Sequence, residues 1–342
     1  MSEFQNEQPT GEERPLVTLA LFAYNQEKYI QDAVEGAFSQ IYSPLEIILT
    51  DDCSTDRTFE IMEEMASNYK GAHKLYLNRN EVNLGVSSHV NKVIALANGS
   101  LIVAAAGDDI SFSNRVSELT NFWAKHGKPS GIIYSKYQPI DSEGSSMDIN
   151  CICEDTSSLS IQDFIHRFNP GIVGGTQAWT KDFIMKFDLL PKGLFCEDAI
   201  FAFRAKLYGQ VLFLDQVLLK YRIHSSSLST DELTFTEQLK KDKQHIDIYN
   251  IFISDIMNSM FGNPNSDLMR ENLICIIQEK IKQMKLDITL IEGDMIERIA
   301  SAFQLSKDRG FKRLIRNVII ALLPTLFCAY KDKKHKSSTI ST

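Results

Sequence analysis

The sequence predicts an α/β fold built on a mostly parallel sheet, and two observations carry this prediction. Apolar runs with the composition of strands buried on both faces lie at residues 17–23, 45–50, 74–77 and 101–106. Segments with helical patterning alternate with them, at about residues 27–40, 57–69 and 86–97. Because strand and helix alternate with short loops, the first 110 residues are expected to form βα units.

Composition narrows the class of protein. The chain has 342 residues, 44% of them hydrophobic, which is enough for one large domain and an appendage. A net charge of -8 argues against a general nucleic-acid binder. Cys151 and Cys153 form the only close cysteine pair, and no CxxC repeat supports a zinc site. The other cysteines are expected to be reduced thiols in a cytoplasmic protein: Cys53, Cys196, Cys275 and Cys328.

Two adjacent carboxylates follow the buried strand at 101–106, after Gly107. Asp108 and Asp109 would then lie at the carboxyl end of the strand, the edge where open α/β sheets bind ligands. Paired acids there repel each other and are costly to desolvate. A Mg²⁺ or Mn²⁺ ion relieves both problems, because these ions prefer oxygen ligands. A solvated turn or a helix cap ahead of Ser113 is the alternative.

Polar residues also follow the first two strands. Tyr24 and Asn25 follow the first, and Asn25 is expected to cap a helix that begins near Glu27. Asp51 and Asp52 follow the second. No GxGxxG or GxxxxGK[ST] sequence is present, so a bound nucleotide would be held by acidic side chains and a metal.

These motifs resemble, in order and at similar spacing, those of the family 2 glycosyltransferases, which have the GT-A fold. The resemblance covers about residues 15–229 and rests on residues 21–25, 50–56, 83–85 with Asn91, 107–109, 197–198 and 221–229. It implies a Rossmann-like nucleotide-binding domain followed by a C-terminal helical appendage.

The resemblance implies roles around a nucleotide-sugar donor. Asp52 would contact the base, although an Asx turn or helix cap is the alternative. Asp109 would bind the metal, with Asp108 near the ribose or the metal. Glu27 would face the pocket or be a solvated acid in a first helical turn. The implied donor-binding set is Ala23, Tyr24, Asn25, Glu27, Asp52, Gly85, Asn91, Asp108, Gly175, Glu197 and Arg222.

The resemblance also assigns the catalytic base to Asp198, the second acid of a pair that opens a helix. A base on one side of the sugar and a departing diphosphate on the other give a single displacement with inversion. His224 would be a metal or phosphate ligand and Arg222 a phosphate contact, or either would be a surface or packing residue. Gly174 and Gly175 would let backbone approach the sugar, or would simply form a bend.

The second half of the chain is expected to lose the βα pattern. The sequence predicts a strand at 132–134, a polar mobile loop at 138–160, a short helix at 161–168 and a strand at 177–179. After residue 230 it predicts helices at 237–260 and 267–284, separated near Pro264, and further helix to about Leu305.

The predicted organisation is a disordered lead-in at 1–14, a glycosyltransferase domain at 15–229, a helical region at 230–306 and a basic amphipathic tail at 307–342. The lead-in has neither a signal peptide nor an anchor pattern. In the tail, an apolar face with flanking basic residues suits peripheral contact with an anionic membrane through residues 310–330. A packing helix or an oligomer contact is the alternative.

The expected function is metal-dependent, inverting transfer of a sugar to a hydroxyl of a growing surface glycan or lipid-linked saccharide, in the cytoplasm or on the inner face of the plasma membrane. No QxxRW motif is present, which favours a non-processive enzyme. The alternatives are a nucleotidyltransferase and a catalytically inactive GT-A scaffold that serves as a binding subunit.

Overall fold

The computed structural model describes residues 14–148, 154–224, 235–259 and 264–293, together with 297–298, 301–302 and 320. The chain divides into two compact units. The first unit comprises Met1–Ser158, Gly171–Gly193 and Gly209–Arg222, and the second comprises Leu159–Pro170, Leu194–Tyr208 and Ile223–Thr342.

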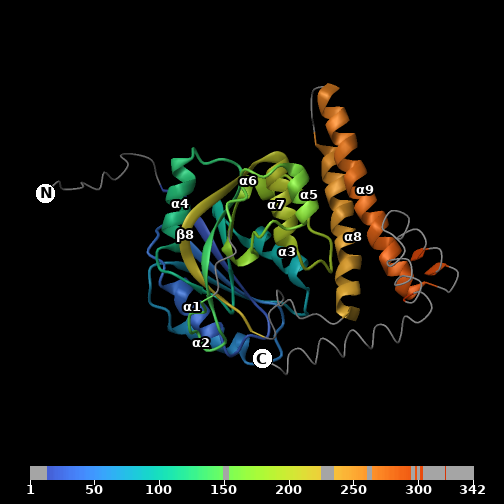
Figure 1. Cartoon of the computed structure of the whole chain (residues 1–342). Coiled ribbons are helices and arrows are strands. Elements are labelled where there is room, and N and C mark those ends of the chain that lie inside the picture. The colour runs from blue at the N-terminus through green and yellow to red at the C-terminus, as the bar shows by residue number, and fades with distance from the viewer. Residues whose placement is uncertain are drawn as a thin grey trace. The chain divides into compact units, whose positions relative to one another are not determined.

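The first unit is built on an eight-stranded sheet in the order β3-β2-β1-β4-β7-β6-β8-β5 (Figure 1). The strands are β1 (Val17–Ala23), β2 (Leu45–Asp51), β3 (Lys74–Arg79), β4 (Leu101–Ala106), β5 (Ile110–Ser111), β6 (Gly131–Ile140), β7 (Gln177–Thr180) and β8 (Gln210–Arg222). Strands β3, β2, β1 and β4 run parallel, as predicted from the alternating pattern.

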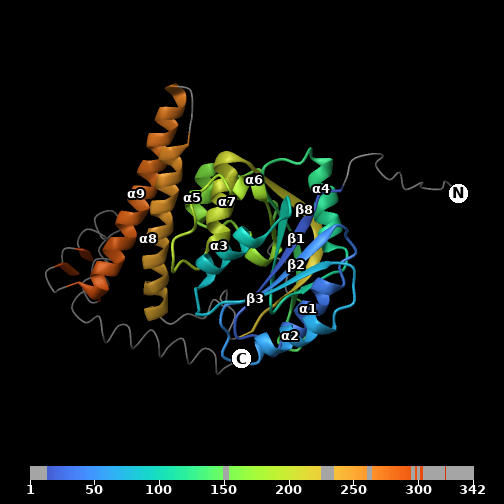
Figure 2. The same cartoon turned by 180° about the vertical axis from the view of Figure 1, so that it is seen from behind.

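Helices cover both faces of this parallel half, which explains why its inner strands β1, β2 and β4 are mostly apolar and almost wholly buried, whereas the edge strand β3 is not. One hydrophobic core combines β1, β2 and β4 with α1 (Ile30–Phe38), α2 (Thr58–Asn68) and α4 (Arg115–Lys125). The helix α3 (Val86–Leu96) buries its own apolar residues on the other side of the sheet (Figures 1 and 2). Every residue of β2 is buried.

The other half of the sheet is mixed and differs from the sequence-based expectation. The strand β7 runs antiparallel to both β4 and β6, whereas β6 and β8 are parallel. The predicted strand at 132–134 extends to Ile140, so the first residues of the predicted polar loop are strand. Pairing explains the extension, because Pro139 and Ile140 lie opposite Tyr221 and Arg222 of β8. Two short helices, η1 (Gly174–Thr176) and α6 (Lys181–Ile184), flank β7.

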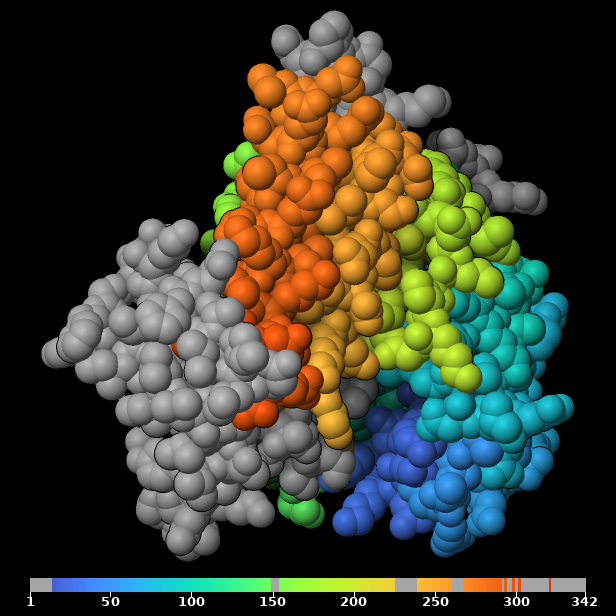
Figure 3. All heavy atoms as spheres, turned by 90° about the vertical axis from the view of Figure 1, so that its right-hand side faces the viewer, coloured from blue at the N-terminus to red at the C-terminus, as the bar shows by residue number. Residues whose placement is uncertain are grey.

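The second unit is helical where the structure describes it, with α5 (Ile161–Arg167), α7 (Glu197–Tyr208), α8 (Phe235–Asn258) and α9 (Pro264–Glu292). Figure 3 shows α8 and α9 lying side by side. The predicted break is confirmed, since Pro264 is the first residue of α9, where its missing N–H costs no helical hydrogen bond. The helix α9 continues well past the predicted end at residue 284.

Buried aromatic and charged contacts join three of these helices. Phe203 of α7 stacks on Phe252 of α8 with ring centroids 3.8 Å apart. Arg204 Nε of α7 donates to Asp255 Oδ2 of α8 at 2.9 Å. The Tyr249 hydroxyl of α8 donates to the Ile165 carbonyl of α5 at 3.0 Å. The α8 helix therefore holds both α5 and α7.

Several predictions fall outside the described residues. These are the lead-in at 1–13, Cys151, Cys153, Cys328 and the amphipathic tail, of which Ile320 alone is described. Cys53, Cys196 and Cys275 are free thiols. In the described ranges, none of the helices combines the length and the apolar character that crossing a membrane requires.

Candidate active site

The carboxyl ends of β1, β2 and β4 meet at one edge of the first unit's sheet, as predicted. Ala23 lies opposite Asp51, and Phe22 lies opposite Ala106. Backbone bonds continue past the strands, because Asp52 N donates to the Ala23 carbonyl at 2.9 Å. Residues 24–25, 51–52 and 107–109 are thereby gathered at the same edge.

Asn25 joins the first two strand ends rather than capping a helix. The predicted cap is wrong, because α1 begins only at Ile30 and has no side-chain cap. Asn25 has a φ of 51° and accepts at Oδ1 from the Thr55 N–H at 2.8 Å, while its own N–H donates to Ser54 Oγ at 2.9 Å. The loop after β1 is therefore fixed to the loop after β2, and the neighbouring Tyr24 ring is left 45% exposed at the edge.

Glu27 supports the same pair of loops. Its Oε2 accepts from the Arg57 N–H at 3.0 Å, and its own N–H donates to Asp56 Oδ2 at 3.1 Å. The side chain is exposed and does not lie in a first helical turn. Glu27 thus links the loop after β1 to the loop after β2 at the edge of the candidate site.

The two acids after β2 have different partners. The carboxylate of Asp51 accepts from both the N–H and the hydroxyl of Ser54, three residues on, and so closes the loop after β2. Asp52 is 4% exposed and accepts hydrogen bonds from Asn80 Nδ2 at 2.7 Å, the Leu84 N–H at 2.9 Å and the Gly85 N–H at 2.9 Å. The partners of the Asp52 carboxylate are therefore on the loop at 80–85, which Asp52 anchors.

Gly85 and Asn91 lie on and beyond this loop. Gly85 has a φ of 76°, a conformation that favours glycine, and precedes α3. Asn91 donates to the Leu190 carbonyl at 2.8 Å and accepts from the Leu190 N–H at 3.0 Å. Because both ends of its amide bind Leu190, Asn91 holds the 190 segment against α3, and its contact with the donor stays a prediction.

The acid pair after β4 is asymmetric. Asp108 is half-buried, whereas Asp109 is 4% exposed. Asp109 Oδ1 accepts from the Arg222 N–H at 2.9 Å, and its Oδ2 is buried with no hydrogen-bond partner. A Cβ placed on Gly175 would lie 2.8 Å from that Oδ2. Gly175 thus allows backbone to approach the acid.

Burial raises the pKa of Asp109 well above its usual value, and the charge of Asp108 adds to the effect. The Arg222 N–H and the charges of Arg115 and Arg222 act in the opposite direction but are weaker. A carboxyl group in this environment favours its neutral form unless a cation is bound beside it.

Arg115 is a buried residue of this edge that sequence reasoning missed. It is 0% exposed and donates to the Ala104 carbonyl at 2.7 Å and the Gly175 carbonyl at 2.6 Å. It thus links the end of β4 to the turn that faces Asp109. No motif marks it, because a single arginine in an amphipathic helix is normally solvated.

Arg222 is buried and contacts protein groups with its whole guanidinium. It donates to the Asp108 carbonyl at 2.9 Å, the Ser142 carbonyl at 3.0 Å and Asp32 Oδ2 at 3.0 Å, and it lies 4.7 Å from the Tyr29 ring centroid. Arg222 therefore holds the Asp108–Asp109 turn, and its contact with a phosphate stays a prediction. Asp32, its partner on α1, was not predicted.

The remaining predicted residues lie in the second unit. Glu197 and Asp198 open α7, as predicted, and His224 is half-buried just after β8. Asp198 Oδ2 accepts from Asn169 Nδ2 at 3.1 Å, and Oδ1 accepts from the Ala199 N–H at 2.7 Å. Burial raises the pKa of Glu197, and the charge of Asp198 adds to the shift, so that this pKa is about 8. Glu197 therefore favours its neutral form at neutral pH.

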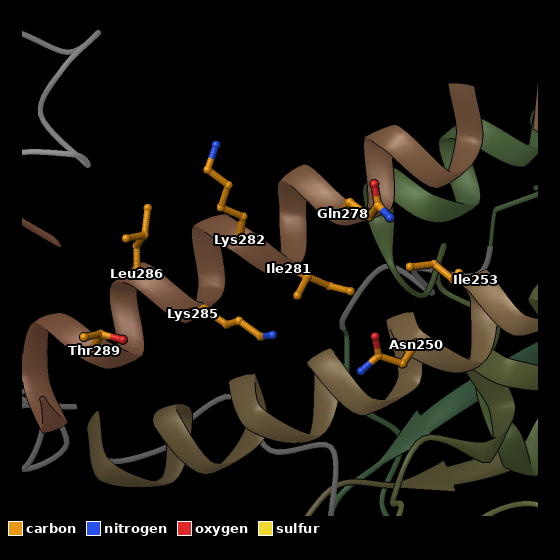
Figure 4. Close-up of a pocket in the computed structure, with 8 residues that line it drawn as sticks. All are labelled: Asn250, Ile253, Gln278, Ile281, Lys282, Lys285, Leu286 and Thr289. Atoms are coloured by element: carbon orange, nitrogen blue, oxygen red, sulfur yellow. The ribbon is translucent and has the colours of Figure 1, made fainter. Parts of the chain in front are cut away.

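A separate groove of about 430 Å³ lies between α8 and α9 (Figure 4). In the close-up Asn250 of α8 and Ile281 of α9 point toward each other's helix, whereas Lys282 points away. None of the predicted site residues lines this groove. Within the described ranges, groups of three or more His, Cys, Asp or Glu side chains arranged to hold a metal are absent.

Comparison with known proteins decides the family. A family model described as glycosyl transferase family 2 matches residues 18–212. The chain belongs to glycosyl transferase family 2. It is therefore a glycosyltransferase with the GT-A fold, and the nucleotidyltransferase alternative is wrong.

Two relatives of this glycosyltransferase match part of its chain. The putative glycosyltransferase EpsE of Bacillus subtilis is 35% identical over 112 residues, 33% of this chain and 40% of EpsE. An uncharacterized glycosyltransferase of Haemophilus influenzae is 26% identical over 230 residues, 63% of this chain and 68% of that protein. The chain thus matches less than half of EpsE and about two thirds of the Haemophilus protein.

Two solved structures share the fold. Residues 1–349 of S. aureus TarS, in complex with UDP-GlcNAc, superpose with a TM-score of 0.60 at 17% identity, covering 93% of this chain and 88% of that one. The mannosyltransferase PcManGT of Pyrobaculum calidifontis, in complex with GDP-Man and Mn²⁺, gives a TM-score of 0.52 at 13% identity over 91% and 88% of the two chains.

Proposed function

We propose that this glycosyltransferase moves a sugar from a nucleotide-sugar donor to an acceptor hydroxyl by a metal-dependent single displacement with inversion. The observation that carries the proposal is the buried Asp109 Oδ2, which has no hydrogen-bond partner and lies beside Asp108 at the ligand edge of the sheet. A buried acceptor without a donor is costly, and a bound cation would remove that cost.

The donor set at this edge suits Mg²⁺ or Mn²⁺. Asp108 and Asp109 offer carboxylate oxygens, which these ions prefer, and nucleotide enzymes commonly complete the coordination with substrate phosphate. A site completed by diphosphate needs only one or two protein ligands. The ion would supply Lewis-acid stabilisation of the departing diphosphate. His224 remains a candidate further ligand.

The nucleotide would bind over the loops after β1 and β2. The exposed Tyr24 ring offers a face for stacking on the base, and Asn25 and Glu27 fix the loops beneath it. Asp52 would act by fixing the loop at 80–85 and by accepting from the base with a lone pair that its protein donors leave free. Gly85 and Ala23 would line the same pocket with backbone.

Asp198 would be the general base. Its carboxylate is oriented by hydrogen bonds from Asn169 Nδ2 and the Ala199 N–H. As the acceptor oxygen forms its bond to the anomeric carbon, its proton passes to Asp198 and the bond to diphosphate breaks. Attack occurs opposite the leaving group, so the configuration inverts.

The acceptor would be a hydroxyl of a growing surface glycan or a lipid-linked saccharide. Support comes from family membership and from the basic, apolar sequence of residues 310–330, which suits peripheral contact with an anionic membrane on the cytoplasmic side.

A donor screen tests the proposal. Purified full-length protein is incubated with UDP-GlcNAc, GDP-mannose and other nucleotide sugars, with Mn²⁺, Mg²⁺ or EDTA, and nucleoside diphosphate release is measured. We expect slow, metal-dependent hydrolysis of at least one donor. Binding of donors without turnover, with or without acceptor saccharides, would favour the inactive scaffold.

A further inference from the structure

The helix α8 lies beyond the residues that the family model matches, which end at residue 212. It nevertheless packs on the segment that carries Asn169 and on the segment that carries Asp198. Phe168 precedes Asn169, and its ring centroid is 4.0 Å from that of His245 on α8. Phe195 lies just before the Glu197–Asp198 pair, and its ring centroid is 6.0 Å from that of His245. The imidazole thus lies in contact with a residue from each segment.

Phe168 has a φ of 66°, an uncommon conformation for a bulky residue. Such a conformation is strained and persists only where neighbours enforce it. Here α8 supplies the neighbours, since Tyr249 and Phe252 also contact the Phe168 ring, with centroids 5.4 Å and 6.3 Å away. If Phe168 relaxed, the next residue, Asn169, would turn away from Asp198.

We propose that His245 is a positioning residue for the catalytic base: by packing on Phe168 and Phe195 it holds Asn169 at hydrogen-bond distance from Asp198. This inference rests on the proposed role of Asp198. Burial lowers the pKa of His245; the charge of Asp242 opposes this shift and that of Lys241 reinforces it. Because the ring is then neutral at pH 7, it acts through its shape and not through a charge.

The first test compares three variants in nucleoside diphosphate release from UDP-GlcNAc or GDP-mannose. His245→Ala removes the ring, His245→Phe keeps a planar ring, and Ile256→Ala removes an equally structural, 0% exposed side chain from the same helix. We expect His245→Ala to lower kcat by about tenfold to a hundredfold, the scale of a misplaced reacting group, with an unchanged KM for donor. His245→Phe should restore kcat, and Ile256→Ala should lower the Tm but not kcat.

A double-mutant cycle then asks whether His245 acts through Asn169. If it does, Asn169→Ala combined with His245→Ala should be no slower than Asn169→Ala alone, because the same hydrogen bond is lost in both. Additive losses, or an equal loss of kcat in Ile256→Ala, would overturn the proposal.

Amide hydrogen exchange separates this inference from the proposed function. If the wild-type protein turns over no donor, the proposed function fails, yet exchange still reports the geometry. We expect peptides covering residues 195–201 to exchange faster in His245→Ala than in either the wild type or Ile256→Ala. Unchanged exchange there would overturn the positioning role even in an active enzyme.

Discussion

Gly175 lies so close to the carboxyl group of Asp109 that a single added methyl group would meet Oδ2 at 2.8 Å. We expect Gly175→Ala to destabilise the protein by about 1–3 kcal/mol, the usual cost of overpacking a buried position. Chemical denaturation measures the change. Asp109→Ala removes the Oδ2 atom that the new methyl group would meet. In an Asp109→Ala background, Gly175→Ala should therefore lower the unfolding free energy clearly less. An equal cost in both backgrounds would mean that the clash lies elsewhere.

Asp198 can be tested by a change that keeps its shape. Asp198→Asn should retain donor affinity but lower turnover by about 10²-fold or more, because an amide cannot take the acceptor proton. Donor affinity is measured by calorimetry and turnover by diphosphate release. Turnover within a few-fold of wild type would reduce Asp198 to a residue at the start of α7.

Glu46 provides a prediction of pH dependence away from the site. Burial opposes its ionisation, but hydrogen bonds from the Thr18 hydroxyl and from Asn98 and Gly99 outweigh burial and lower its pKa. A lowered folded-state pKa gives stability that is present above the unfolded pKa and is lost as pH falls through the folded one. Between about pH 5 and 3, the unfolding free energy should therefore fall more steeply for wild type than for Glu46→Gln. Parallel pH profiles would contradict this role.

At this scale the sequence predicted which residues cluster but not which of two neighbours does what. The motifs placed Asp51–Asp52 and Asp108–Asp109 at the correct edge, because apolar runs show where strands end. They could not show that Asp51 binds Ser54 within its own loop whereas Asp52 anchors the loop at 80–85. The buried Arg115 and the exposed Asp32 left no sequence signal, because the groups that they bind include the Gly175 carbonyl and Arg222, which are distant in sequence.

Among the elements, α7 and α8 are joined by a buried ion pair between Arg204 and Asp255, whose side chains are 5% and 10% exposed. Asp255→Ala would remove the carboxylate that pairs with the buried Arg204, so we expect a loss of about 3–5 kcal/mol of unfolding free energy. Replacing both residues with apolar ones, as Arg204→Met with Asp255→Leu, should be much less costly. Denaturant unfolding of the three proteins checks this, and a double variant as unstable as Asp255→Ala would contradict it.

The elements of the parallel half were predictable because local patterning decides them. The sequence prediction ended the strand β6 at residue 134, because the second half of the strand carries Lys136, Gln138 and Pro139 among apolar residues. Pairing with the long β8, rather than local composition, makes that half a strand. The helix α9 runs on to Glu292, into the stretch beyond residue 284 where the sequence predicted further helix.

For the whole molecule, we propose one reaction of this family 2 glycosyltransferase, in which the sheet edge would bind the donor and Asp198 would activate the acceptor. Family and fold followed from the ordered motifs, and the family model and the TarS superposition confirm them. Sugar and acceptor identity remain open to the donor screen, because pocket shape, not a motif, selects among hydroxyl orientations.

The stereochemistry of donor hydrolysis tests the central claim most directly. Early proton NMR spectra, taken before mutarotation, report the anomer of the sugar first released from an α-linked donor such as UDP-GlcNAc or GDP-mannose. The account predicts that wild type with Mn²⁺ releases the β anomer first, and that Asp198→Asn releases sugar at least about 10²-fold more slowly. First release of the α anomer would contradict a single inverting displacement.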